Sequence, residues 1–111
     1  MILTMDVGNT NIKTALFDGK EMFKYWRMST NITSTSDEYG VRLTSMFAHE
    51  NVPTSVVDGI VVSSVVPTIN YTIEHMLQNY FGTDWILFRK RGLENDPDNG
   101  YREHEHQNCA V

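Results

Sequence analysis

One short stretch near the start of the chain combines residue types that could hold a phosphorylated ligand, Asp6-Val7-Gly8-Asn9-Thr10-Asn11-Ile12-Lys13. Asp6 ends an otherwise apolar run, where a buried carboxylate is costly unless it is paired or bound to a metal. Glycine lets the backbone turn tightly and approach a ligand. The N–H and side-chain donors that follow suit phosphate oxygens, and the acid suits magnesium, directly or through water. The stretch therefore predicts a magnesium-nucleotide site with Asp6 as the metal ligand.

Each residue of this stretch also has a purely structural interpretation. Asp6 could instead cap the following turn through its own side chain. Thr10 and Asn11 are the best candidates for phosphate contacts, and Lys13 either neutralises phosphate charge or is a solvated strand lysine. The rest of the candidate cofactor-binding set is Val7, Gly8, Asn9 and Ile12. The stretch is not a Walker loop, because it lacks the G-x-x-x-x-G-K-[ST] spacing and leads into a strand.

Ser63 and Ser64 follow a buried apolar run and are candidates for lining a ligand cleft. Ligands of α/β sheets bind at the carboxyl ends of the strands. The alternative is that the two serines cap a helix that begins near Pro67. No general base stands at a recognisable spacing from either serine, so no catalytic residue is assigned.

Histidines and the single cysteine do not form a recognisable metal site. His104, His106 and Cys109 superficially resemble zinc ligands, but their spacing matches no standard zinc pattern. His49 and His75 lie off the apolar stripes of the expected helices, so we expect both to be exposed.

The site must be positioned by elements that the pattern also predicts. Strands are expected at residues 1–7, 11–17 and 20–28, with a hairpin at Asp18-Gly19, which makes an antiparallel meander. In the third strand Phe23, Tyr25 and Arg27 alternate with Met22, Lys24, Trp26 and Met28.

Two helices and two further strands complete the expected order β-β-β-α-β-α-β. Thr35 and Glu38 have the form of a capping box ahead of an apolar stripe at Tyr39, Leu43, Met46 and Phe47. A buried strand is expected within residues 56–66. A second helix starts near Pro67 and ends at Gly82, and a strand follows at 85–88. Residues 1–88 then form one α/β domain, and residues 89–111 a polar tail, irregular or disordered by composition.

Four motifs occur in order along the first 88 residues. They are Asp6-Val7-Gly8-Asn9-Thr10-Asn11, Trp26-Arg27-x-Ser29-Thr30, Asp37-Glu38-Tyr39-Gly40 and Ser63-Ser64-Val65-Val66-Pro67. With them the chain resembles the N-terminal half of a type III pantothenate kinase, of the acetate/sugar kinase–Hsp70–actin superfamily. The resemblance implies a ribonuclease-H-like, actin-like ATPase half-domain, with helices packed on a mixed sheet.

The resemblance also implies an activity and its partners. Family members phosphorylate pantothenate with ATP in coenzyme A biosynthesis, use Mg²⁺ and a monovalent cation (K⁺ or NH₄⁺), and are dimeric, which implies a cytoplasmic kinase. The resemblance also places Arg27 near the cleft or against the phosphate turn, since arginine can bind a phosphate through two parallel hydrogen bonds. The alternative is an exposed strand arginine beside a core Trp26.

Some family features are missing from the 111 residues. The general base of the family is an aspartate in a Gly-Ala-Asp-Arg motif of a second half-domain, and this motif is absent. The Gly-Pro and Lys-Thr-Gly-Leu-like segments of the family have only a weakly similar counterpart here, at Arg89-Lys90-Arg91-Gly92-Leu93. We therefore expect a truncated, ATP-binding half that is inactive alone, with a tail unrelated to the family. The alternatives are a non-catalytic nucleotide-binding or transcription-accessory module, and a structural remnant with an empty turn.

Composition sets the remaining expectations. A net charge of −5 argues against nucleic acid and anionic membranes as partners. No apolar run approaches the roughly 20 residues of a membrane span, and no secretion signal is visible. One cysteine excludes an internal disulfide and fits a reducing cytoplasm. Because a half-domain exposes apolar faces, we expect a homodimer or larger oligomer.

Overall fold

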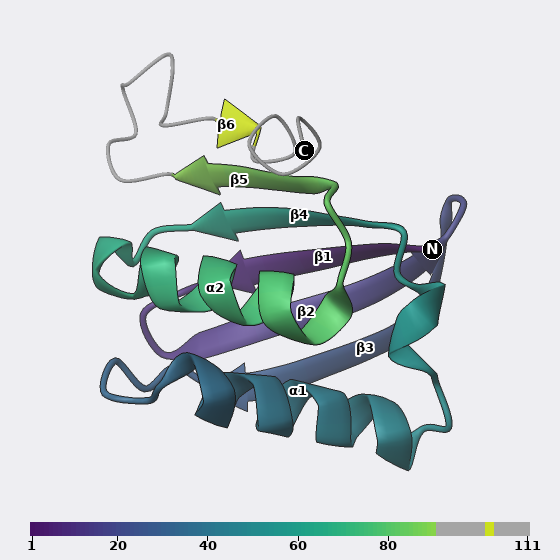
Figure 1. Ribbon diagram of the computed structural model, residues 1–111, viewed down its shortest axis with the longest axis horizontal. Helices are drawn as coiled ribbons and strands as arrows, with labels where there is room; N and C mark the ends of the chain where they lie inside the picture. The colour runs from purple at the N-terminus through teal and green to yellow at the C-terminus, as the bar shows by residue number, and fades with distance from the viewer. Residues whose placement is uncertain (91–101, 104–111) are drawn as a thin grey trace.

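The computed structural model describes residues 1–90 and 102–103, and within them the chain forms a mixed sheet with two α-helices on one face (Figure 1). The strand order is β3-β2-β1-β4-β5-β6. The strands are β1 (Ile2–Val7), β2 (Asn11–Asp18), β3 (Glu21–Ser29), β4 (Gly59–Ser64), β5 (Ile86–Lys90) and β6 (Arg102–Glu103). The expected α/β fold is confirmed.

The first three strands form the predicted meander. β1 pairs antiparallel with β2, and β2 antiparallel with β3. Gly19 in the β2–β3 hairpin has φ +64°, a left-handed conformation that glycine adopts without a steric penalty. The expected alternation along β3 is also present, because Trp26 and Met28 are buried while Tyr25 and Arg27 are exposed.

Strands β1, β4 and β5 form the parallel part of the sheet, and helices lie in the connections to β4 and β5. β4 lies parallel to both β1 and β5. Helix α1 (Ser36–His49) begins with the predicted capping box: the Glu38 N–H donates to Thr35 Oγ1 at 3.1 Å, and the Thr35 N–H donates to Glu38 Oε1 at 2.7 Å. Helix α2 (Asn70–Phe81) ends at Gly82, which has φ +65°.

Several element boundaries differ from those expected. Pro67 opens a short 3₁₀ helix (Pro67–Ile69), and α2 itself begins only at Asn70. Another 3₁₀ turn, Thr54–Val56, precedes β4, which is shorter than the 56–66 segment. β5 extends past Phe88 to Lys90 because it continues to pair with β4, and β6 pairs with β5. The rest of the expected tail, 91–101 and 104–111, lies outside the described residues.

The core lies between the helices and one face of the sheet. Leu3, Met5 and Val7 of β1 point into it and are almost fully buried. The Trp26 ring stacks on Phe47 of α1 with 4.6 Å between ring centroids. Within the described residues no helix covers the opposite face of the sheet. We call this the open face, and its side chains include Ile2, Thr4, Asp6, Lys13, Tyr25, Arg27, Val61, Ser63 and Arg89.

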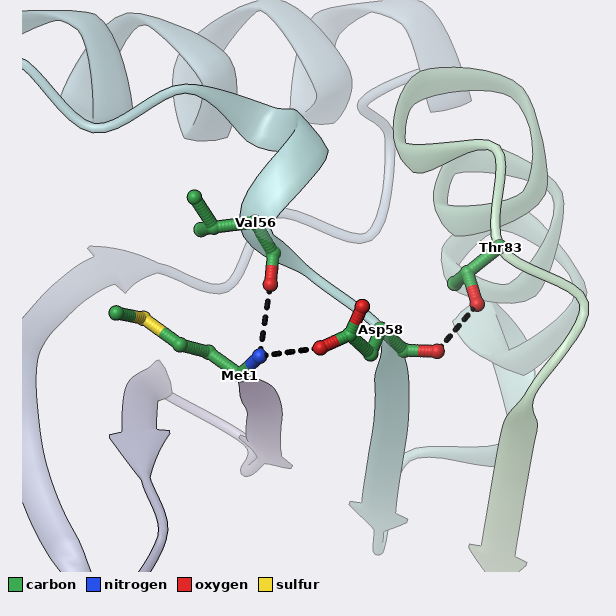
Figure 2. Close-up of polar contacts among 4 residues, drawn as sticks. All are labelled: Met1, Val56, Asp58 and Thr83. Atoms are coloured by element: carbon green, nitrogen blue, oxygen red, sulfur yellow. Dashed lines mark hydrogen bonds and ion pairs between the residues drawn. The ribbon is translucent and has the colours of Figure 1, made fainter.

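Polar contacts fasten the amino end of β1 to the segment before β4 (Figure 2). The Met1 ammonium group donates to Val56 O at 2.8 Å and forms an ion pair with Asp58 Oδ2 at 2.6 Å. The carbonyl oxygen of Asp58 accepts a bond from Thr83 Oγ1 at 2.7 Å. These bonds align the starts of β1, β4 and β5, and so the carboxyl ends of the same strands also meet at one edge.

The two helices are in close contact where Gly40 of α1 meets Tyr80 of α2. A Cβ atom on Gly40 would lie 2.4 Å from the Tyr80 ring, so the ring occupies the space that any larger residue would need. The Tyr80 hydroxyl donates to Asp37 Oδ1 at 2.8 Å, and this bond raises the pKa of Tyr80. The contact sets the position of α1 relative to α2.

We predict that Gly40→Ala destabilises the fold. Overpacking against the Tyr80 ring costs about 1–3 kcal/mol, and the better helix propensity of alanine offsets about 1 kcal/mol of this. Urea denaturation would measure the difference. The cost of Gly40→Ala should disappear when Tyr80 is replaced by Ala, and an equal cost in that background would show that the Tyr80 ring is not its cause.

Candidate functional site

One edge of the sheet brings together most of the residues singled out from the sequence. Figure 1 shows the carboxyl ends of β1, β3, β4 and β5 at this edge, at the left of the view, together with the β1–β2 turn (residues 8–10). Both helices also begin at this edge. Ligands of α/β sheets bind at this end of the strands.

The β1–β2 turn presents backbone N–H groups at the surface. The Gly8 N–H donates to Asn11 O at 2.9 Å, which closes the turn. A Cβ on residue 8 would lie 3.2 Å from Asn11 O, closer than ordinary packing, so glycine suits this position. Within the described residues, the N–H groups of Asn9 and Thr10 have no acceptor, and both residues are exposed. Exposed, unpaired N–H groups in a turn are suited to an anion.

A row of charged side chains crosses the open face next to this turn. Asp6 pairs in register with Lys13 of β2 and with Ser63 of β4, while Arg27 and Arg89 are the next partners on either side. Residues directly opposite each other in a sheet point to the same face, and neighbouring strands lie about 4.8 Å apart. The row therefore places one carboxylate among three cationic side chains.

The environment of Asp6 differs from the one expected. The apolar sequence of β1 indicated a buried carboxylate, but Asp6 is exposed. The reason is that the helices cover only one face of β1, and Asp6 alternates with Met5 and Val7 on that strand. Within the described residues the Asp6 carboxylate has no hydrogen-bond or ion-pair partner, so it does not cap the turn.

The other members of the predicted stretch contribute unequally. The side chains of Val7 and Ile12 are fully buried in the core, so only their backbone groups face the edge. Thr10 is exposed, and its Oγ1 accepts a long bond from Asn11 Nδ2 at 3.4 Å. Lys13 is exposed beside Asp6. The side chains available to a ligand are therefore those of Asp6, Asn9, Thr10, Asn11 and Lys13.

The three cleft candidates also occupy different positions. Arg27 lies on the open face, where its Nη2 contacts the Tyr25 hydroxyl at 3.5 Å, while Trp26 packs in the core. Ser63 is half-buried in the charged row. Ser64 is buried on the opposite face, and its hydroxyl accepts the Val66 N–H at 3.1 Å. Ser64 thus supports the turn after β4, while Ser63 and Arg27 point to the same face as Asp6.

Thr30, which the sequence singles out only as a member of the Trp26-Arg27-x-Ser29-Thr30 motif, contacts the β1–β2 turn. Its N–H donates to Thr10 O at 2.9 Å and its Oγ1 donates to Gly8 O at 2.7 Å. Thr30, the residue that follows β3, therefore holds the β1–β2 turn directly. The motif that contains Thr30 was the available signal, but nothing in it showed which distant residues Thr30 would contact.

Metal ligation by protein side chains alone is not supported in the described part of the chain. No cluster of three or more histidine, cysteine or acidic residues occurs there. Asp6 can supply one oxygen ligand, and magnesium completes its shell with phosphate oxygens and water when it binds with a nucleotide. His49 and His75 are exposed as expected. His104, His106 and Cys109 lie outside the described residues.

The strand order and the two helices on one face of the mixed sheet are compatible with an actin-like ATPase half-domain. The sequence model of the type III pantothenate kinase family matches residues 2–107, so the chain belongs to the type III pantothenate kinase family. The match extends beyond Phe88, so the expectation that the tail is unrelated to the family was wrong.

A curated relative agrees with this assignment. A type III pantothenate kinase of Exiguobacterium sp. (strain ATCC BAA-1283 / AT1b) is 48% identical over 87 residues, which cover 78% of this chain and 34% of the relative. The chain thus spans about a third of the length of this relative. No helix among the described residues is long and apolar enough to cross a membrane.

We predict that Asp6→Ala leaves the free energy of unfolding within about 0.5 kcal/mol of the wild type, because the exposed carboxylate makes no bond that alanine would lose. Replacement of a capping aspartate by alanine would instead cost about 1 kcal/mol. Urea denaturation near neutral pH distinguishes the two values. A decrease of more than about 1 kcal/mol in the free energy of unfolding would instead support the structural interpretation, in which Asp6 caps the turn.

Proposed function

We propose that this chain binds magnesium-ATP at the β1–β2 turn and forms the phosphate-binding half of a type III pantothenate kinase. One observation carries the proposal: the unpartnered Asp6 carboxylate stands beside exposed, unpaired N–H groups and between cationic strands. A structural carboxylate would normally be bonded to the turn that it precedes. The group is instead available to a ligand.

The charges of the row match a nucleotide polyphosphate bound with a metal. Lys13 and Arg27 on one side, and Arg89 on the other, can neutralise phosphate oxygens, and arginine can do so with two parallel bonds. The N–H groups of Asn9 and Thr10 can donate to the same oxygens. Asp6 would hold magnesium directly or through water, and the metal when bound neutralises charge that develops during phosphoryl transfer.

The row offers no second acid for proton abstraction. Transfer of a phosphoryl group to pantothenate needs a base that takes the proton of the substrate hydroxyl. Asp6 serves the metal in this proposal, and its partners in the row are cations and Ser63. We therefore propose that the chain alone binds the nucleotide and does not complete the reaction. K⁺ or NH₄⁺ as monovalent cation and a cytoplasmic location belong to the same proposal by family.

Isothermal titration with magnesium-ATP tests the binding site. We expect the wild type to bind and Asp6→Asn to bind at least about tenfold more weakly, because the loss of a charged ligand interaction is worth about 1.5–3 kcal/mol. Asp18→Asn is the matched control, since Asp18 is an exposed acid at the other end of β2 and should change nothing. Absence of binding by the wild type, or equal effects of both variants, would refute the site.

A coupled assay with pantothenate, magnesium-ATP and potassium separates this proposal from others. Binding without turnover supports a phosphate-binding half. Turnover that Asp6→Asn abolishes would show that the chain supplies its own base and would contradict the proposed inactivity. A non-catalytic nucleotide-binding or transcription-accessory module is the second candidate, favoured by the lack of a second acid in the row. If turnover appears when the remaining part of a family kinase is added, the chain is not such a non-catalytic module.

We also propose that the chain self-associates through the open face. Ile2, Tyr25 and Val61 are 41%, 46% and 38% exposed there. Contiguous exposed apolar side chains favour association. Light scattering should give the mass of a dimer or larger oligomer for the wild type. Val61→Glu should lower the mass, and Val41→Glu on α1 should not; a monomeric wild type at all concentrations would contradict the proposal.

A further inference from the structure

We infer that Thr30 and Tyr39 are positioning residues for nucleotide binding, which they support by fixing the orientation of the β1–β2 turn. The inference rests on the proposed function, since it concerns the same turn. It assigns a role to two residues that do not themselves belong to the phosphate-binding stretch. Thr30 contacts the turn, and Tyr39 acts on the turn through Asn31.

The bond from Thr30 Oγ1 to Gly8 O, 2.7 Å long, controls the direction of a ligand-binding N–H group. The carbonyl of Gly8 and the N–H of Asn9 belong to one planar trans peptide unit, so they point in opposite directions. When Thr30 holds the carbonyl, the Asn9 N–H must face away from Thr30. Without this bond the peptide plane could rotate and present a carbonyl oxygen, which would repel a phosphate.

A second bond from the same residue restrains the other side of the turn. The backbone N–H of Thr30 donates to Thr10 O at 2.9 Å. Thr30 thereby engages carbonyl oxygens on both sides of Asn9, while the N–H groups of Asn9 and Thr10 keep no acceptor among the described residues. Thr30 thus binds the carbonyl oxygens of the turn, and the N–H groups of the turn remain for an anion.

Tyr39 fixes the segment that carries Thr30. The Tyr39 hydroxyl donates to Asn31 O at 2.6 Å and accepts the Asn31 N–H at 2.9 Å. Its side chain is fully buried, so the hydroxyl has a position defined by the core. The Asn31 N–H belongs to the peptide unit that also contains the carbonyl of Thr30. The path from the core to the turn therefore consists of Tyr39, Asn31 and Thr30, in direct contact.

The test combines magnesium-ATP titration with the ¹⁵N–¹H resonance of Asn9 in the ligand-free protein. Thr30→Val removes the hydroxyl and keeps the shape and the backbone N–H, Tyr39→Phe keeps the buried ring, and Thr30→Ser restores the donor. Thr33→Val is the matched control, because its hydroxyl bonds only the Asn31 side chain of the same loop, at 2.7 Å.

We expect Thr30→Val and Tyr39→Phe to weaken magnesium-ATP binding by about fivefold to tenfold, the equivalent of one lost hydrogen bond. Both should shift the Asn9 resonance before any ligand is added. Thr30→Ser should restore affinity to within about twofold of the wild type, and Thr33→Val should leave both readouts unchanged. Rescue by serine is not expected of a residue that acts only through its bulk.

The outcomes separate this inference from the proposed function. A wild type that binds no magnesium-ATP refutes the proposed function and, with it, the nucleotide role of Thr30 and Tyr39. Binding by the wild type that survives Thr30→Val and Tyr39→Phe overturns the inference and leaves the proposed function standing. An unchanged Asn9 resonance in both variants also overturns it, whatever the affinity, because the turn would then not depend on these hydroxyls.

Discussion

The register of β1 against β2 and β4 is the constraint on which the site depends. Side chains of a strand alternate between two faces, so a shift of one residue would exchange Asp6 with Met5 or Val7. The burial of Leu3, Met5 and Val7 under the helices opposes such a shift, because a charged group would enter the core and apolar groups would leave it. The packing of the core thus keeps Asp6 on the open face, beside Lys13.

The same core positions the turn by a second route. Each member of the Asp37-Glu38-Tyr39-Gly40 motif has a structural partner. Asp37 bonds Tyr80, Glu38 completes the helix cap with Thr35, and Gly40 admits the Tyr80 ring. Tyr39 then connects α1 to the loop that holds the β1–β2 turn. The motif is therefore part of the support of the site.

Much of the fold follows from local patterns, whereas the site depends on contacts between distant residues. The capping box at Thr35 and the alternation of Trp26 and Arg27 are local and could be predicted. The exposure of Asp6 could not, because an apolar strand indicates burial without showing that helices cover only one face. The role of Thr30 requires a contact with Gly8, 22 positions earlier, and no short motif encodes such a pairing.

The separation of charge along the sheet makes the proposed anion site compatible with an acidic chain. The chain carries a net charge of −5, yet the row around Asp6 carries Lys13, Arg27 and Arg89. Screening limits the effect of charges beyond about 10 Å at ordinary ionic strength, so the local cations outweigh distant acids. A nucleotide polyphosphate binds together with magnesium, and this metal ion can bind the single carboxylate that lies among the cations of the row. Under the proposed function, a metal-bound polyphosphate suits this arrangement better than a free cation or a simple anion, because it brings both signs of charge to the row.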